Sequence, residues 1–515
     1  MGAARREPGR VHAVATGMPL FAVLALIGAV AMFAPALHAL SVGDEFTARA
    51  FGYSALGAIL VIALVAVARA NVSHRRPAQN QLLALLGAYT VLPVMLAVPF
   101  HEAVPNTRFV NAYVEMVSAL TTTGASMFDP SRLTGSVHLW RATVGWIGGL
   151  FTWVTAVAIM APLDLGGFEV LSLRGAGRGA SRFSQIAAVA APSERLARFT
   201  RLFLPIYAGL TLALWMLLSM AGEDPLVALC HAMSTLATSG ITPLRGMQTA
   251  EAGIIGEVFI ALFLVLALSR ATFTRDNRTA RRDFVHGDVE LRFAAAILVT
   301  LTVFLFMRHF LGAADADGAS DLAAAFYALW GAFFTLLGFL TTAGWESLAW
   351  EDARSWSRLQ APGLILVGVA MIGGGVATTA GGVKLFRIYA LYKQGVREME
   401  RLVRPNSIGG SGSLARRIRR QGAYVAWIFF MLFAVTLAAL TIALAATGVP
   451  LQDGLVYAAA ALSNTGPLVA VASEQTLAWS ALGDVGKLVV SAGMVLGRME
   501  MLAIVALLNP DLWRG

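Results

Sequence analysis

The sequence predicts an all-α polytopic membrane protein built from four M1–P–M2 units, each a helix, a re-entrant pore loop and a second helix. The units surround one pore and are preceded by two extra transmembrane helices. Three observations lead to this fold class: a composition poor in charge, ten apolar segments long enough to cross a bilayer, and four shorter apolar segments that each end in a glycine-centred cluster. Each unit returns the chain to its starting side, so all four have the same orientation and can share an axis.

The composition excludes an ordinary soluble protein. Hydrophobic residues make up 57% of the 515 residues and charged residues only 13%, whereas a soluble domain has about 25% charged residues. The net charge of +9 does not indicate nucleic-acid binding, because nearly all Lys and Arg lie in short segments between apolar runs, as in cytoplasmic loops that face anionic lipid. The lipid bilayer is therefore the expected partner, and nucleic acid is not. The single cysteine, Cys230, excludes an internal disulfide framework and a Cys-based metal site.

The crossing segments follow from length, because a helix needs about 20 mostly apolar residues to cross the hydrocarbon core. Ten segments meet this condition: 17–39, 50–68, 81–100, 140–163, 199–221, 252–273, 292–311, 361–390, 422–447 and 480–508. Four further apolar segments are too short or too interrupted: 111–123, 225–239, 322–342 and 453–465. We expect the first span to be retained rather than cleaved as a signal peptide, because its apolar run is longer than the usual 7–15 or so residues of such a signal.

The basic loops predict the orientation of the chain. They all fall on one face if the four short segments enter and leave the membrane by the same side, and they alternate between faces if those segments cross fully. The most basic stretch runs from Lys384 to Arg420, and acidic residues such as Asp44 and Glu45 lie in the opposite connections. The positive-inside rule then places both termini in the cytoplasm. The charge pattern therefore itself favours re-entry of the short segments.

An internal repeat divides the chain, because a small-residue cluster with one glycine follows each short segment. The resulting units are an N-terminal two-helix extension at 1–77 and pore repeats at 78–190, 191–285, 286–400 (with a broken second helix) and 401–515. The cluster residues that we expect to form a selectivity filter are Thr122, Thr123 and Gly124; Thr238, Ser239 and Gly240; Thr342, Ala343 and Gly344; and Asn464, Thr465 and Gly466. One such cluster is typical of helix packing or a loop, but four in equivalent places favour a shared structural role.

The physics of this arrangement points to a cation. A short helix that stops within the membrane directs its partly negative C-terminal end inward, and the returning extended backbone can turn its carbonyl groups toward the axis. Glycine permits the backbone angles and the close approach of four strands. Rings of carbonyl oxygens that replace an ion's hydration shell are the known means of passing K⁺. The clusters therefore predict a filter that conducts a cation, built in the way that is known to pass K⁺.

Four stretches of the sequence are similar to motifs of a known family: EMVSALTTTGAS at 115–126, SNTGP at 463–467, LGRME at 496–500 and GGGVATTAGGVK at 373–384. Through them the chain, over nearly its whole length, resembles the Trk/Ktr/HKT superfamily of potassium transporters, and within it the Trk-type membrane subunit. The two extra N-terminal spans are similar to the Trk type rather than to the shorter Ktr type. Gly375, Ala377 and Trp345 depart from the residues that the superfamily usually has at these places.

The resemblance implies roles for particular residues. Glycine at all four filter positions implies a preference for potassium over sodium, and Glu115 is expected to brace the filter. The broken eighth span implies a flexible loop that obstructs the pore beneath the filter, although a tolerated kink would also explain its glycines. The residues of this expected gating loop are Gly373, Gly374, Gly375, Thr378, Thr379, Gly381, Gly382 and Lys384.

A charge in the last apolar span has two explanations. Arg498 is costly within a bilayer, so it either extends to the interface from the end of the helix or, by resemblance, lines the pore as an electrostatic barrier. In the second case Glu500 is expected to balance it and to support the filter.

The expected cofactors and partners also follow from the resemblance. K⁺ is the transported ion, and the chain itself is expected to hold no organic cofactor, because its glycine-rich runs do not lie in a βαβ unit. A cytoplasmic regulatory subunit of the TrkA type, which binds NAD or ATP, and a homodimer are implied. The basic stretch 393–420 is either the docking site of that subunit or an ordinary positive-inside loop. The implied location is the bacterial inner (cytoplasmic) membrane.

One alternative function stays open. A coupled secondary transporter, such as a K⁺/H⁺ or K⁺/Na⁺ symporter, often binds its substrate between inverted repeats with acidic residues inside the membrane. Here the repeats are parallel, and we find no pair of carboxylates in the middle of a span. An intramembrane enzyme is disfavoured because the apolar segments contain no His-Glu-x-x-His and no convincing catalytic pair. We therefore expect a transporter that is not an enzyme.

Overall fold

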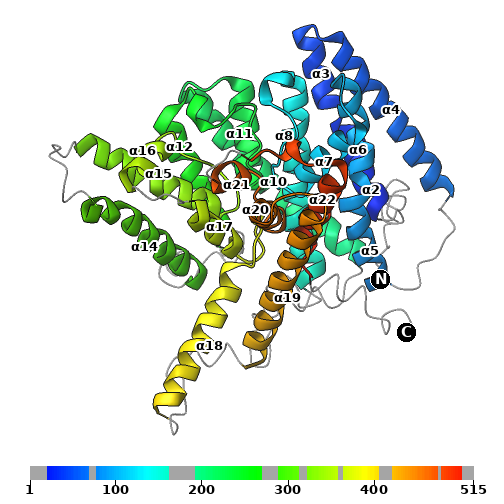
Figure 1. Cartoon of the computed structure of the whole chain (residues 1–515). Helices are drawn as coiled ribbons and strands as arrows, with labels where there is room; N and C mark the ends of the chain where they lie inside the picture. Colours follow the sequence, from blue (N-terminus) through cyan, green and yellow to red (C-terminus); the bar gives the residue numbers. More distant parts are fainter. Residues whose placement is uncertain are drawn as a thin grey trace, which may run out of the picture.

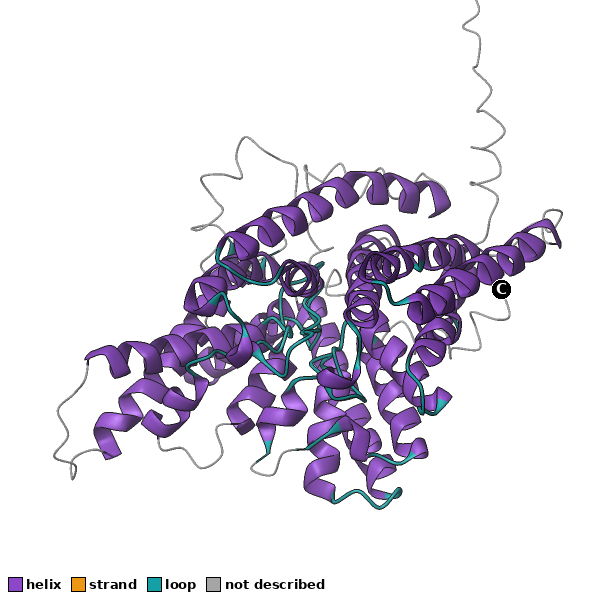
Figure 2. Cartoon of the chain, turned by 90° about the horizontal axis from the view of Figure 1, so that it is seen from above, coloured by secondary structure: helices purple, strands orange, loops and turns teal. Residues whose placement is uncertain are grey.

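The computed structural model describes residues 20–68, 77–161, 192–269, 288–312, 322–357, 363–404, 420–473 and 477–501. These residues form helices joined by turns and loops, and they include no β-strand, so the predicted all-α class is confirmed. The bundle is seen from the side in Figure 1, and the view from above in Figure 2 shows loops gathered between the helices in its middle.

The N-terminal helices are α2 (Leu20–Ala31), α3 (Phe33–Val42) and α4 (Glu45–Ala68), followed by α5 (Pro77–Thr90) and α6 (Leu92–Ala103). Two of the predicted spans are thus each divided in two, between α2 and α3 and between α5 and α6. Pro35 and Pro93 explain the breaks, because proline lacks the amide hydrogen that would bond to the carbonyl four residues earlier and its ring crowds that carbonyl.

The remaining helices follow the order long helix, short helix, further helix. In the first group, α7 (Phe109–Leu120) and α8 (Gly135–Thr155) follow α5 and α6. The second group consists of α10 (Pro192–Met220), α11 (Pro225–Ala237) and α12 (Gly253–Leu264). The third consists of α14 (Val289–Gly312), α15 (Leu322–Leu340), α16 (Trp350–Ser357), α17 (Gly363–Ile372) and α18 (Leu385–Val403). The fourth consists of α19 (Arg420–Ala445), α20 (Leu451–Leu462), α21 (Leu468–Ala472) and α22 (Asp484–Met499).

When α2 and α3 are taken together as one span, and α5 and α6 as another, seven helical spans in the described part of the chain are long and apolar enough to cross a membrane: Phe21–Val42, Glu45–Ala68, Leu82–Ala103, Gly135–Met160, Arg195–Met220, Val289–Met307 and Gly422–Ala445. Seven of the ten predicted spans are therefore found as such helices. The other three predicted spans, 252–273, 361–390 and 480–508, contain shorter helices. The first changes to a 3₁₀ turn at Val265–Leu268, the second is broken between α17 and α18, and the third ends before Glu500. Residues 270–273, 361–362 and 502–508 of these spans lie outside the described part.

Packing closes the helices into a ring. Each of the short helices α7, α11, α15 and α20 contacts a neighbour within its own group, and contacts between groups join α8 to α11, α12 to α15, α17 to α20 and α22 to α7. The last of these contacts joins the end of the chain back to the first group. Burial agrees with this arrangement, since 78% of the apolar stretch of the α8 span is buried, but only 22% of the apolar stretch of α4. The ring therefore surrounds the four turns that follow the short helices, while α4 presents an apolar surface to lipid.

Candidate functional site

The four expected filter segments begin with the same backbone conformation. One residue at the start of each segment has a positive φ: 53° at Thr122, 51° at Thr238, 59° at Thr342 and 55° at Asn464. In three segments it is the second residue after the short helix, and in the second segment it is the equivalent residue. A positive φ is unfavourable for a residue with a side chain, and a β-branched residue such as threonine adopts it only as an outlier. Strained backbone of this kind persists where the surrounding structure enforces it, and it is frequent at functional sites.

The glycine two residues later repeats in three of the four segments. Gly124, Gly240 and Gly344 have φ values of 73°, 63° and 70°, in the region that glycine adopts at little cost. Gly466 differs, because its φ is not in this positive region and Pro467 follows it. The four segments are thus similar but not equivalent.

The four segments contact one another in chain order. A Cβ added to Gly124 would overlap the carbonyl oxygen of Ser239, and one added to Gly240 would overlap that of Ala343. A Cβ on Gly344 would lie 2.8 Å from Cγ of Pro467.

The ring closes between the fourth segment and the first, where the Gly466 amide donates a 2.6 Å hydrogen bond to the Thr123 carbonyl oxygen. No side chain at the glycine positions could be accommodated without moving a neighbouring segment.

The closed ring is rich in buried oxygen atoms. Thr122, Thr123, Asn464 and Thr465 are each less than 1% exposed. Oγ1 of Thr123 accepts a 3.0 Å bond from Nδ2 of Asn464. Oγ1 of Thr122 and Oδ1 of Asn464 have no hydrogen-bond partner among the described residues. Because buried oxygens are ordinarily satisfied, this concentration of side-chain and backbone oxygens fits a cation that passes along the axis.

The expected gating loop lies directly against three of these segments. The Gly381 amide donates a 2.7 Å hydrogen bond to Oγ1 of Thr342, and Oγ1 of Thr379 donates a 3.2 Å bond to the Leu236 carbonyl oxygen. A Cβ on Gly381 would overlap the carbonyl oxygen of Ser463. The loop therefore touches the second, third and fourth segments at their start.

The same loop is closed at its base by backbone hydrogen bonds. The amides of Val383 and Lys384 each donate a 2.9 Å bond to α17, and the Leu385 amide donates one to Gly374 at 2.9 Å. Gly373 and Gly382 both have a φ of 74° and pack so closely that a Cβ on Gly382 would lie 2.7 Å from Cα of Gly373.

Further contacts fix the rest of the loop. Oγ1 of Thr378 donates to the Gly375 carbonyl at 2.7 Å, and the Gly375 amide donates to the carbonyl of Ala267, beyond α12, at 3.1 Å. Glu290 on α14 accepts a 2.9 Å bond from the Val376 amide. The glycines of the broken span thus belong to a defined loop rather than to a kinked helix.

Arg498 joins this loop to the first segment. Its side chain is only 4% exposed. Nε donates to the Thr121 carbonyl at 2.8 Å, and Nη1 donates to the Thr379 carbonyl at 2.7 Å. Nη2 has no hydrogen-bond partner, and no carboxylate forms an ion pair with Arg498, among the described residues. The structure therefore places this charge inside the protein, between the ring and the loop.

Glu500 differs from the expectation that it balances Arg498. Its carboxylate pairs instead with Arg387 on α18, at 2.5 Å between Oε2 and Nη2. The helix ends at Met499, and Glu500 has a positive φ of 64°, so Glu500 does not continue the helix that carries Arg498. Sequence reasoning did not identify Arg387, because a basic residue just after the loop matched an ordinary positive-inside charge.

Two buried carboxylates bind the chain a few residues beyond the glycines of the first and third segments. Glu115 accepts a 2.6 Å bond from Nε of Arg141 and a 2.7 Å bond from the Met127 amide, a geometry compatible with its expected bracing role. Glu257 on α12 accepts bonds from Nε1 of Trp330 at 2.6 Å and from the Leu348 amide at 2.5 Å. Arg141 and Glu257 were not predicted, although an ionisable residue within an apolar span is a signal for a functional or structural site.

Trp345, which departs from the superfamily, packs edge-on against His231 of α11 with ring centroids 5.1 Å apart. Its side chain is 2% exposed. It thereby links the third segment to the helix before the second.

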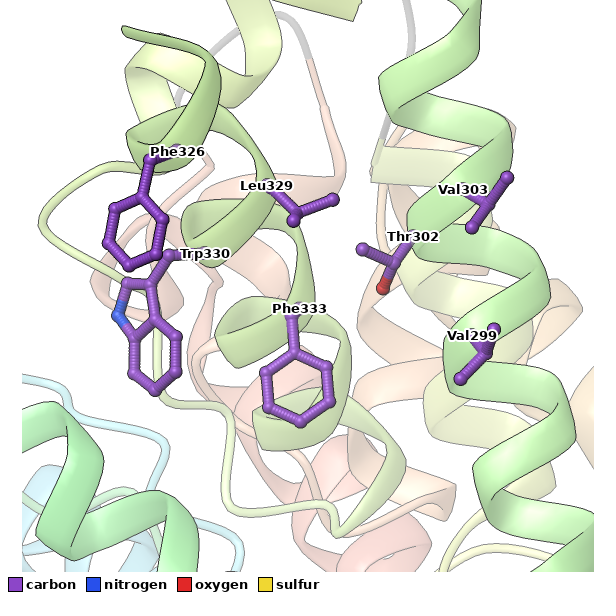
Figure 3. Close-up of a pocket in the computed structure, with 7 residues that line it drawn as sticks. All are labelled: Val299, Thr302, Val303, Phe326, Leu329, Trp330 and Phe333. Atoms are coloured by element: carbon purple, nitrogen blue, oxygen red, sulfur yellow. The ribbon is translucent and has the colours of Figure 1, made fainter. Parts of the chain in front are cut away.

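An apolar groove of about 210 Å³ lies apart from the ring, between α14 and α15 (Figure 3). It is lined by Val299, Thr302, Val303, Phe326, Leu329, Trp330 and Phe333. An ion would lose its hydration there with almost no polar atoms to replace it, so the groove is not a cation site.

The seven apolar helices define the class of the chain, which is a multi-pass membrane protein. A family model described as TrkH, a cation transport protein, matches residues 54–511, and the chain therefore belongs to this family. The resemblance to Trk-type transporters noted in the sequence is thus confirmed.

Several named proteins are similar to the chain. It is 29% identical to the Trk system potassium uptake protein TrkH of Vibrio parahaemolyticus over 86% of this chain and 87% of that one. It is 29% identical to the TrkH protein of Escherichia coli over 83% of this chain and 84% of that one. The crystal structure of the potassium transporter TrkH from Vibrio parahaemolyticus superimposes with a TM-score of 0.79 at 25% identity, and the match covers 97% of this chain and 99% of that one.

Proposed function

We propose that the chain takes up potassium ions across the bacterial cytoplasmic membrane through a channel-like pore. The four turns after α7, α11, α15 and α20 form its selectivity filter, and the loop 373–384 forms its gate. The four M1–P–M2 repeats are the units bounded at 78, 191, 286 and 401. The observation that carries this proposal is the closed ring of turns, in which the first segment meets the second and the fourth returns to Thr123.

The chemistry of the ring supports a large, weakly hydrated cation. Backbone carbonyl and threonine oxygens are neutral, so they can replace the water around K⁺ without binding it too tightly to leave. A site for a tightly held metal would need a cluster of ionisable ligands, and the described residues contain no such group of His, Cys, Asp and Glu.

The gate acts by obstruction and by charge. Loop 373–384 contacts the ring directly, and Arg498 places a positive charge next to it. A cation that has passed the ring therefore meets both a steric and an electrostatic barrier. Movement of the loop away from Thr342 would remove the contact between loop and ring and the contact between loop and Arg498 together.

Regulation by a second subunit is part of the proposal. Helix α18 extends from the bundle beside α19 (Figure 1), and its far end exposes Leu402 and Val403, which are 85% and 79% accessible. An exposed apolar end on a projecting helix supports docking of a nucleotide-binding subunit of the TrkA type, with both termini of this chain in the cytoplasm. Residues 405–419 of the predicted docking stretch 393–420 lie outside the described part of the chain. A homodimer is proposed on the resemblance alone.

Cation flux into liposomes tests the proposal. The purified protein is reconstituted, and uptake of K⁺, Rb⁺ and Na⁺ is compared in the presence and absence of a proton or sodium gradient. Fast K⁺ and Rb⁺ uptake with little Na⁺ uptake, driven by voltage alone, is the expected result. Uptake that requires a H⁺ or Na⁺ gradient would establish the symport alternative, and absence of selectivity would refute the filter.

A further inference from the structure

A buried ion pair connects the exit of the loop to the end of the last helix. Arg387 lies in the first turn of α18, three residues after Lys384, and Glu500 follows α22, two residues after Arg498. The Arg387 side chain is fully buried and that of Glu500 is 8% exposed. This pair is therefore shielded from water and joins two parts of the chain that each carry a gate residue.

Arg387 also binds on its other faces. Its guanidinium carbon lies 3.6 Å from the centre of the Phe429 ring on α19, and Nη1 donates a 3.3 Å bond to the Val383 carbonyl. A desolvated cation–π contact adds to the attraction of the carboxylate. Arg387 thus holds the loop exit, α19 and the end of α22 together.

The loop is consequently attached to α22 at two points. Arg498 binds the middle of the loop through the Thr379 carbonyl, and Glu500 binds its exit through Arg387. The backbone beside the second attachment is strained, with φ values of 84° at Lys384 and 64° at Glu500. Because such conformations persist only where surrounding contacts enforce them, loss of the ion pair would let both backbones relax.

The charges around the pair determine which partner matters most. Lys384 lies within electrostatic range of Glu500, Arg498, Arg387 and Glu290. Removal of the Glu500 charge therefore leaves the positive charges of Lys384, Arg387 and Arg498 with less negative charge nearby to balance them. Like charges in a buried place repel strongly.

We propose that Arg387 and Glu500 are positioning residues of the gate: their ion pair keeps the loop 373–384 pressed against the ring of turns, and its loss releases the loop. This inference deepens the proposed function and rests on it. Neither residue is required to touch the ion, because both act through the position of Thr379 and Gly381.

A cysteine reporter measures the position of the loop directly. Cys230 is the chain's single cysteine and is buried, so Cys230→Ala gives a cysteine-free background. Thr378→Cys then places a thiol on the loop at a position that is 3% exposed. The rate of its modification by a charged methanethiosulfonate reagent is measured in the purified full chain.

The expected result is a rate about tenfold higher in Glu500→Gln and in Arg387→Gln than in the reporter alone. Arg387→Lys is expected to keep the rate low, and the exchange Arg387→Glu with Glu500→Arg to restore it. Asp484→Asn is the matched control, because it breaks an exposed pair with Arg108 at the opposite end of α22 and should leave the rate unchanged.

Two outcomes overturn the inference. An unchanged rate in both neutral variants shows that the pair does not position the loop. A raised rate that neither Arg387→Lys nor the charge exchange reverses shows that packing, and not the ion pair, is responsible. Size-exclusion profiles identify a variant that does not fold, and Glu500→Asp, a milder change, then decides in place of Glu500→Gln.

Rubidium flux separates this inference from the proposed function. Glu500→Gln is expected to raise basal Rb⁺ uptake about threefold or more. A raised thiol reactivity with no cation uptake in any variant would refute the pore while leaving the positioning role intact.

Discussion

Replacement of Gly124 by serine tests the filter most sharply. The backbone φ at this position is 73°, a conformation that costs a residue with a side chain about 1–2 kcal/mol relative to glycine. The new Cβ would also overlap the carbonyl oxygen of Ser239, so the first and second turns must move apart and the carbonyl must turn.

The expected effect on selectivity follows from that strain. In the proposed filter, the new side chain destabilises the arrangement of oxygens that would bind K⁺, so most of the cost is expected to fall on K⁺ binding. Since about 1.4 kcal/mol corresponds to a factor of ten, we expect the K⁺ over Na⁺ permeability ratio to fall about tenfold in Gly124→Ser.

Reversal potentials provide the measurement. Liposomes that contain the purified variant are loaded with K⁺ and diluted into Na⁺, and a voltage-sensitive dye reports the potential at which net flux stops. Gly222→Ser is the matched control, because Gly222 has a φ of 96° and a Cβ there would meet nothing within 4 Å. Gly222→Ser therefore has the backbone strain of Gly124→Ser without the collision with another turn, so its K⁺ over Na⁺ permeability ratio should equal that of the unmodified chain.

The reasoning would be refuted by either of two results. A Gly124→Ser protein that conducts at an unaltered rate with an unaltered ratio cannot have this residue in its filter. A Gly222→Ser protein whose ratio falls equally would show that backbone strain anywhere in the chain lowers selectivity, and that contact between the turns is irrelevant.

Three further predictions concern buried charges. If Arg498 forms the proposed electrostatic barrier beside Thr379, basal Rb⁺ uptake of Arg498→Gln should rise about tenfold in the liposome assay; equal or slower uptake would contradict a barrier role. Glu115→Gln breaks a pair with Arg141 that is buried on both sides, and the free energy of unfolding should fall by about 3–5 kcal/mol, measured by denaturant unfolding in detergent; a loss below about 1 kcal/mol would argue against bracing. Glu257→Gln weakens the acceptor of several hydrogen bonds and should lower the free energy of unfolding by about 1–3 kcal/mol; no loss in the same unfolding experiment would show that these bonds contribute little.

Local sequence signals were sufficient for seven of the ten predicted spans and for the position of the turns. A short apolar helix followed by small polar residues and glycine located Gly124, Gly240 and Gly344, because a single residue type permits the backbone angles that the turn requires. The same kind of signal located the loop at 373–384, where consecutive glycines interrupt an apolar span. The roles of these residues in selectivity and gating remain predictions.

Contacts between distant parts of the chain could not be predicted in the same way. The Arg387–Glu500 pair joins residues 113 positions apart, and Glu257 binds Leu348 across 91 positions. Periodicity and composition describe one helix at a time and contain no information about which helices meet. For the same reason the proximity of Glu500 to Arg498 in the sequence suggested the wrong partner for its carboxylate.

The hydrogen bond from Gly466 to Thr123 also has a consequence for how the protein assembles. These two residues form the seam at which the last group of helices meets the first, so the first turn has a neighbour on one side only until nearly the whole chain has been synthesised and inserted. Backbone polar groups left without a partner in hydrocarbon cost several kcal/mol each. A chain that stops before α20 should therefore leave an open arc of polar backbone within the bilayer, which makes it a natural substrate for membrane quality control.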